Sequence, residues 1–109
     1  MKLEHSLITK VIIELGNELK QKYPYYKGIY LYGSRARGNY SADSDYDMVI
    51  TFDKEIDWRF ESEILGIVYN YIVEYEILID CKVYNNSEIL NPDTPFRLNV
   101  KNEGIFYGV

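Results

Sequence analysis

Two aspartates, Asp45 and Asp47, flank Tyr46 at the start of a stretch that is typical of a β-strand. Side chains two residues apart on a strand point to the same face, so the two carboxylates would lie roughly 7 Å apart. Like charges at that distance raise each other's pKa unless a cation lies between them. Oxygen ligands favour Mg²⁺, Mn²⁺ or Ca²⁺ over zinc. The pair therefore suggests a divalent cation, although an acidic loop that includes Asp43 is the better interpretation when the pair is taken alone.

A glycine and a serine, Gly33-Ser34, end the preceding strand-like stretch abruptly. Glycine allows a tight turn whose backbone N–H groups point toward a phosphate, and the Ser34 hydroxyl can donate to the same group. Arg35 and Arg37 follow, and a guanidinium suits phosphate oxygens. Arg37 is the preferred phosphate ligand because a residue three positions after Ser34 returns to the same side of a helical turn. Taken alone, a Gly-Ser pair is most often an ordinary turn.

The elements that must position these residues follow from the spacing of apolar side chains. A stripe at helical spacing predicts a first helix that Pro24 stops near 22–23, and its members are Leu3, Leu7, Val11, Leu15 and Leu19. Alternation and turn residues predict strands over 28–32, 46–52, 74–84 and 105–107, helices over 57–71 and 94–102, and a turn at 85–87. Asp57 and Thr94 are the expected N-caps. We therefore expect an α/β (α+β) fold, a mixed sheet with helices packed on it.

One combination of residues resembles the signature of the DNA polymerase β-like nucleotidyltransferase superfamily. It consists of Gly33-Ser34, ten intervening residues and Asp45-Tyr46-Asp47. The fuller strings, residues 33–38 and 44–47, look like the minimal nucleotidyltransferases of that superfamily, and the tail around residues 94–96 and 103–105 resembles their ending. The resemblance implies the nucleotidyltransferase fold and transfer of a nucleoside monophosphate, AMP from ATP in the first instance, to a hydroxyl acceptor. It also implies Mg²⁺, with two ions expected.

The resemblance further implies a third carboxylate on a neighbouring strand, and Asp80 is the candidate. Ile77, Ile79, Cys81 and Val83 alternate with it and form the expected core face. If the other face is covered, a mid-strand carboxylate there needs a partner, and a metal ion would provide one. The alternatives are an ion pair with Lys82 and a sheet face that is open to solvent. Glu76 has the same parity as Asp80 and is the reserve candidate. The expected catalytic and metal-binding set is thus Asp45, Asp47 and Asp80, and the expected nucleotide ligands are Gly33, Ser34 and Arg37.

The minimal members of this superfamily are often antitoxins paired with a helical HEPN-domain toxin, and some attach AMP to a tyrosine of that partner. The resemblance implies this role here. Two alternatives stay open: an antitoxin that neutralises its partner by contact alone, and nucleotidyl transfer to a small molecule. The oligomeric state also stays open, with a homo-oligomer among the expectations.

Composition limits the remaining classes of function. The 109 residues carry a net charge of −5, which argues against strong nucleic-acid binding because that needs a basic face. There is one cysteine, so an internal disulfide is excluded. The absence of an apolar signal segment or membrane span predicts a cytoplasmic protein, and the length predicts one nucleotidyltransferase domain over residues 1–109.

Overall fold

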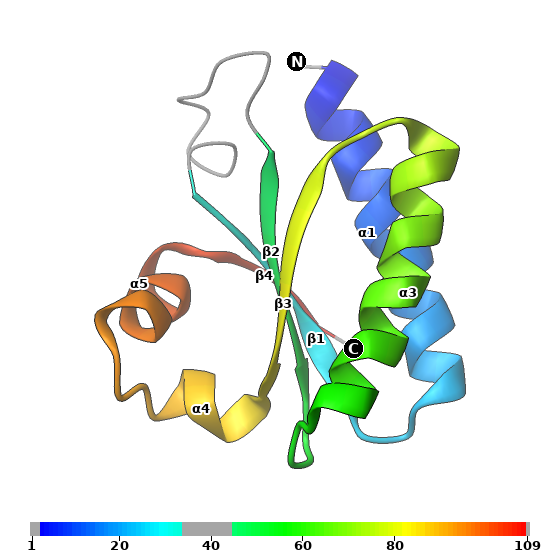
Figure 1. Ribbon diagram of the computed structural model, residues 1–109. Helices are drawn as coiled ribbons and strands as arrows, with labels where there is room; N and C mark the ends of the chain where they lie inside the picture. Colours follow the sequence, from blue (N-terminus) through cyan, green and yellow to red (C-terminus); the bar gives the residue numbers. More distant parts are fainter. Residues whose placement is uncertain (1–2, 34–44, 109) are drawn as a thin grey trace.

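The fold is a four-stranded mixed sheet with helices on both faces, and the computed structural model describes residues 3–33 and 45–108 (Figure 1). The elements are α1 (Leu3–Lys22), β1 (Tyr26–Tyr32), β2 (Tyr46–Phe52), α3 (Trp58–Tyr75), β3 (Ile79–Asn85), α4 (Asn86–Leu90), α5 (Pro95–Glu103) and β4 (Ile105–Gly108). The strand order is β3-β2-β1-β4; β2 and β3 are parallel, and the other neighbours are antiparallel. The predicted mixed α/β architecture is confirmed.

Each face of the sheet has its own apolar layer. Helices α1 and α3 lie together on one face, and α4 and α5 lie on the other (Figure 1). Strand β2 supplies both layers because its side chains alternate: Met48 and Ile50 pack toward α1 and α3, whereas Val49 packs toward α4 and α5. All three are fully buried, and a continuous apolar run of this kind is typical of a strand that is covered on both faces, as β2 is.

The predicted helix starts are confirmed by their caps. The Asp57 carboxylate accepts from the Phe60 N–H at 2.8 Å, and the Thr94 hydroxyl accepts from the Arg97 N–H at 3.2 Å ahead of Pro95. These bonds satisfy N–H groups that the first turn of a helix otherwise leaves unpaired.

Helix α3 extends four residues beyond its predicted end at residue 71, and the predicted strand over 74–84 is wrong at its start. The extra turn is held by α1: the Tyr71 hydroxyl donates to Glu18 at 2.8 Å, and that of Tyr75 donates to Glu14 at 2.6 Å. Glu76 then ends the helix with φ 55°, so β3 begins only at Ile79. Pairing between helices far apart in sequence prevailed over local strand propensity.

The segment after β3 also differs from the predicted simple turn. Asn85 caps a short helix, α4, through a capping box in which its side chain accepts from Ser87 N–H and the Glu88 carboxylate accepts from the Asn85 N–H. Ile89 of that helix is buried in the apolar layer that α4 and α5 form with the sheet. The predicted edge strand near residues 105–107 is present as β4, which pairs with β1.

None of the helices within the described ranges has both the length and the apolar character required to cross a membrane.

The apolar layer between the sheet and helices α1 and α3 depends on α1, and one matched pair of leucine substitutions tests this. Leu15 is 0% exposed, whereas Leu98 on α5 is 47% exposed. Leu15→Ala should lower the free energy of unfolding by about 2–5 kcal/mol, because it removes buried methyl groups and leaves a cavity. Leu98→Ala should change it by less than about 0.5 kcal/mol. Urea unfolding followed by circular dichroism measures both, and equal losses would contradict this assignment of the core.

Candidate active site

Three strands bring the candidate residues to one end of the sheet, where β1 ends and β2 and β3 begin. In the strand register, Tyr32 lies opposite Asp47, and Asp47 lies opposite Asp80. These side chains belong to the face that α4 and α5 cover, as predicted for the face opposite Ile79, Cys81 and Val83. Residues separated by up to 48 positions in the chain thus become neighbours through strand pairing alone.

Gly33 lies directly against the Asp47 carboxylate. Its φ of 84° is in the left-handed region, which a side chain disfavours. A Cβ built at this position would also overlap Asp47 Oδ2. Glycine is therefore required twice, by the backbone conformation and by the close approach of the carboxylate.

The candidate site is strongly negative. Burial raises the pKa of Asp47 above its usual range, and repulsion from Asp80 and then Asp45 raises it further, while Lys82 acts in the opposite direction. Burial is also the largest cause of the raised pKa of the Tyr32 hydroxyl, and the negative charges of Asp47 and Asp80 raise that pKa further. The Tyr32 hydroxyl therefore remains protonated at neutral pH.

The carboxylates fit a hard cation in type, but their present arrangement is looser than a complete ligand set. Asp80 Oδ2 lies 3.8 Å from Lys82 Nζ, and about half of the Asp80 side chain is exposed. Among residues 3–33 and 45–108, no three His, Cys, Asp or Glu side chains converge closely enough to hold one ion. An exposed ion pair of this kind contributes at most about 1 kcal/mol, so turning Asp80 from Lys82 toward Asp47 has a small cost.

The other predicted site residues have different outcomes. Asp45 immediately precedes β2 and is exposed, close enough to contribute to the repulsion on Asp47. Ser34, Arg35 and Arg37 lie outside the residues that the structure describes. Glu76 is not a reserve ligand: it caps α3 and precedes β3, so it has no strand parity with Asp80.

An aromatic wall beside the acids was not predicted. The Phe96 ring of α5 meets Tyr32 edge-to-face at 5.3 Å between centroids, lies 6.3 Å from Tyr84, and has Lys82 Nζ at 5.4 Å from its centre. A small cavity of about 190 Å³ opens next to this wall; it is lined by Tyr32, Gly33, Phe96, Asn99 and Glu103. Phe96, Asn99 and Glu103 recur at helical spacing after the helix start at Thr94-Pro95. This spacing was the one feature of the sequence that could have shown that they share a face of α5.

A titration of Asp47 measures directly how strongly the neighbouring acids repel its carboxylate. Because the folded chain holds the Asp47 proton more tightly than the unfolded chain, its contribution to stability is present below the ordinary pKa of 3.8 and is lost as pH rises through the raised value. In a carbon-13 NMR titration of the carboxyl groups, Asp80→Asn should lower the pKa of Asp47, and Lys82→Met should raise it. Asp53→Asn, at the other end of β2, is the control and should leave it unchanged; an Asp47 pKa unaffected by Asp80→Asn would contradict the assigned cause.

The position of Gly33 allows a second comparison. Gly33→Ala should lower the free energy of unfolding by about 1–2 kcal/mol from the left-handed backbone alone. Gly66→Ala is the matched control, since a Cβ there meets nothing within 4 Å and the helix favours alanine by about 1 kcal/mol. Chemical unfolding should therefore show opposite signs for the two variants, and a Gly33→Ala protein as stable as the parent would exclude the close contact with Asp47.

Comparisons with known proteins agree with this geometry. Residues 12–107 match the nucleotidyltransferase domain family. A provisionally named protein adenylyltransferase of Methanocaldococcus jannaschii, MJ0604, is 41% identical over 80 residues, covering 68% of this chain and 80% of that protein. Protein adenylyltransferase MntA of Aphanizomenon flos-aquae is 48% identical over 42 residues, covering 38% of this chain and 28% of that protein.

A crystal structure of a toxin–antitoxin with AMP-PNP has a similar fold, with a TM-score of 0.63 and 21% identity over 90% of this chain and 71% of that one. The family match includes Asp45, the strands that carry Asp47 and Asp80, all of α3, α4 and α5, and the part of α1 from residue 12 onward. The chain belongs to the nucleotidyltransferase domain family and is an enzyme of that class.

Proposed function

We propose that this chain transfers AMP from ATP to a hydroxyl group of a partner protein, with Asp45, Asp47 and Asp80 as the catalytic and metal-binding residues. The observation that carries this proposal is the placement of Asp47 between Gly33 and Asp80 at one end of the sheet. Such a cluster of carboxylates beside a glycine turn suits a nucleotide bound with its cation. The names of the relatives, two of them protein adenylyltransferases, support the choice of AMP and of a protein acceptor.

Each residue would have a separate task. Asp45, Asp47 and Asp80 would hold Mg²⁺, two ions in the full complex, and Mg²⁺ supplies neutralisation of the phosphate charge and activation of the acceptor hydroxyl. The Gly33 turn, Ser34 and Arg37 would bind phosphate oxygens and orient the triphosphate. The acceptor oxygen bonds to the α-phosphorus, the α–β phosphoanhydride bond breaks, pyrophosphate leaves, and the hydroxyl proton passes to solvent.

The proposed acceptor is a tyrosine of a helical HEPN-domain toxin, which makes this chain an antitoxin. The toxin–antitoxin structure with AMP-PNP supports that context, since its fold is similar and its ligand is an ATP analogue. The acid cluster lies at an end of the sheet with Asp45 exposed and Asp80 half exposed, so a side chain from outside the molecule can approach it.

A second candidate is an antitoxin that acts by contact alone. The ion pair between Asp80 and Lys82 favours this alternative, because it engages a carboxylate that the enzyme needs. The raised pKa of Asp47 favours the enzyme, since three acids without a cation cost the free chain stability.

Loss of one acid should separate these candidates. Asp47→Asn or Asp80→Asn should reduce AMP transfer by more than about a hundredfold, because each removes a ligand worth several kcal/mol in the transition state. The measurement is intact-mass spectrometry of the partner after incubation with ATP and Mg²⁺, with Asp53→Asn as a folded control that retains transfer. Removal of Mg²⁺ by EDTA should abolish transfer by the parent.

The same variants should still bind the partner, because Asp80 lies within the cluster rather than on a wide contact surface. Co-purification and protection of cells from the toxin are the two readouts. Asp80→Asn protein that binds the partner but no longer protects supports the enzyme. Protection that persists without any mass added to the partner would establish the contact-only antitoxin instead.

A further inference from the structure

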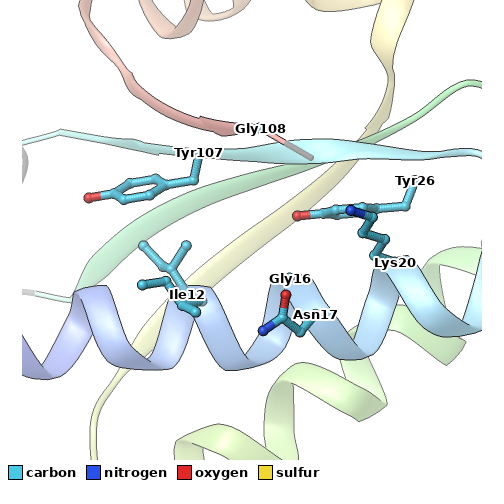
Figure 2. Close-up of a pocket in the computed structure, with 8 residues that line it drawn as sticks. Ile12, Gly16, Asn17, Lys20, Tyr26, Tyr107 and Gly108 are labelled. Carbon is cyan, nitrogen blue, oxygen red and sulfur yellow. The ribbon is translucent and has the colours of Figure 1, made fainter.

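A second site lies on the opposite face of the sheet from the acids, between α1 and the strands β1 and β4 (Figure 2). It is a pocket of about 300 Å³, within the size range of small-molecule sites. The described residues that line it are Ile12, Ile13, Gly16, Asn17, Lys20, Tyr26, Tyr107 and Gly108. Neither the acid cluster nor the nucleotidyl transfer proposed for it uses any of these residues.

The hydroxyl of Tyr26 marks this pocket as more than a packing gap. Tyr26 is only 6% exposed, and Figure 2 shows its hydroxyl directed into the space between β1 and α1. Within the described part of the chain, this hydroxyl has no hydrogen-bond partner. A Cβ at Gly16 would come within 3.1 Å of it, so the missing side chain keeps that space open. Among the described residues no buried side-chain nitrogen or oxygen lacks a hydrogen-bond partner, so solvent reaches this hydroxyl through the pocket and it is free to donate to a bound acceptor.

The charge of the pocket selects the kind of acceptor. Lys20 is the one charged residue among the described lining residues, and no carboxylate is present among them. Burial raises the pKa of Tyr26 to about 12, so its hydroxyl stays protonated and acts as a donor. One ammonium group and one hydroxyl donor in the lining of the same pocket match a single negative charge, whereas a phosphate dianion would leave a charge uncompensated.

Apolar side chains complete the recognition. Ile12 and Ile13 of α1 form one wall, and the Tyr107 ring of β4 lies across from Ile12 (Figure 2). Ile13 is 54% exposed, which leaves part of that wall open to solvent. A ligand with a compact apolar body would cover this surface while its charged end reaches Lys20.

We propose that this pocket binds a small organic monocarboxylate with a compact apolar body. Lys20 pairs with the carboxylate, the Tyr26 hydroxyl donates to it, and Ile12, Ile13 and Tyr107 contact the apolar body. The inference stands apart from nucleotidyl transfer, because the two sites lie on opposite faces of the sheet.

Benzoate is a suitable probe, with benzyl alcohol as its uncharged counterpart. In nitrogen-15 NMR titrations of the full chain, benzoate should produce saturable shifts of the Gly16, Asn17 and Gly108 signals. Lys20→Met and Tyr26→Phe should each weaken binding by about tenfold or more, as expected for lost hydrogen bonds to a charged group. Lys22→Met is the matched control, since it removes the same charge from the same helix outside the pocket and should leave the affinity unchanged.

Three results would overturn the proposal. Shifts that do not saturate or do not localise to the lining residues would show that no site exists. Equal affinity for benzyl alcohol and benzoate, or unchanged affinity in Lys20→Met, would exclude the carboxylate. Concentration-dependent broadening of the same signals without ligand, with a dimer mass in light scattering, would show that a second copy of the chain fills the pocket.

Discussion

The register of β2 is the constraint on which the candidate active site depends. Met48, Val49 and Ile50 are all fully buried, and they alternate between the two apolar layers. A slip of one residue would exchange the faces of the whole strand and drive Asp47 into the layer beneath α1 and α3. Burial of this short apolar run therefore holds the carboxylate at the end of the sheet, next to Gly33 and opposite Asp80.

The same register creates an electrostatic cost that the rest of the fold must offset. Asp80 and Asp45 both repel the Asp47 carboxylate, and Lys82 is the one cause that lowers the pKa of Asp47. Two apolar layers supply the compensating stability, so the acids need not be neutralised within the free chain. Under the proposed function, a cluster held in this way would gain free energy when a cation and a nucleotide bind to it.

Strand β1 links the two sites of the molecule. Its last residue, Tyr32, lies next to the acids and the Phe96 ring. Its first residue, Tyr26, lies on the opposite face of the sheet and lines the pocket beside α1. Alternation along the strand, together with the irregular register between Tyr26 and Gly28, places these two tyrosines on opposite faces. One strand thus contributes to a polar site at one end and to an amphipathic pocket at the other.

The sequence by itself determined the features that depend on local spacing. The β2 strand and the caps Asp57 and Thr94 were visible in it, because caps and alternation involve residues only a few positions apart. The combination of Gly33-Ser34 with Asp45 and Asp47 was instead noticed through the resemblance to a family. The face of β3 that carries Asp80 was also predictable from alternation. The roles of Asp45, Asp47, Asp80, Gly33, Ser34 and Arg37 remain predictions for the experiments above.

Only the tertiary structure decided where distant segments meet. The extra turn of α3 exists because Tyr71 and Tyr75 find glutamates on α1, which moved the start of β3 and removed Glu76 from the candidate ligands. Strand pairing placed Asp80 opposite Asp47, and the packing of α5 brought Phe96 beside them. These contacts join residues tens of positions apart, and their energies come from burial and pairing that no local window of sequence contains.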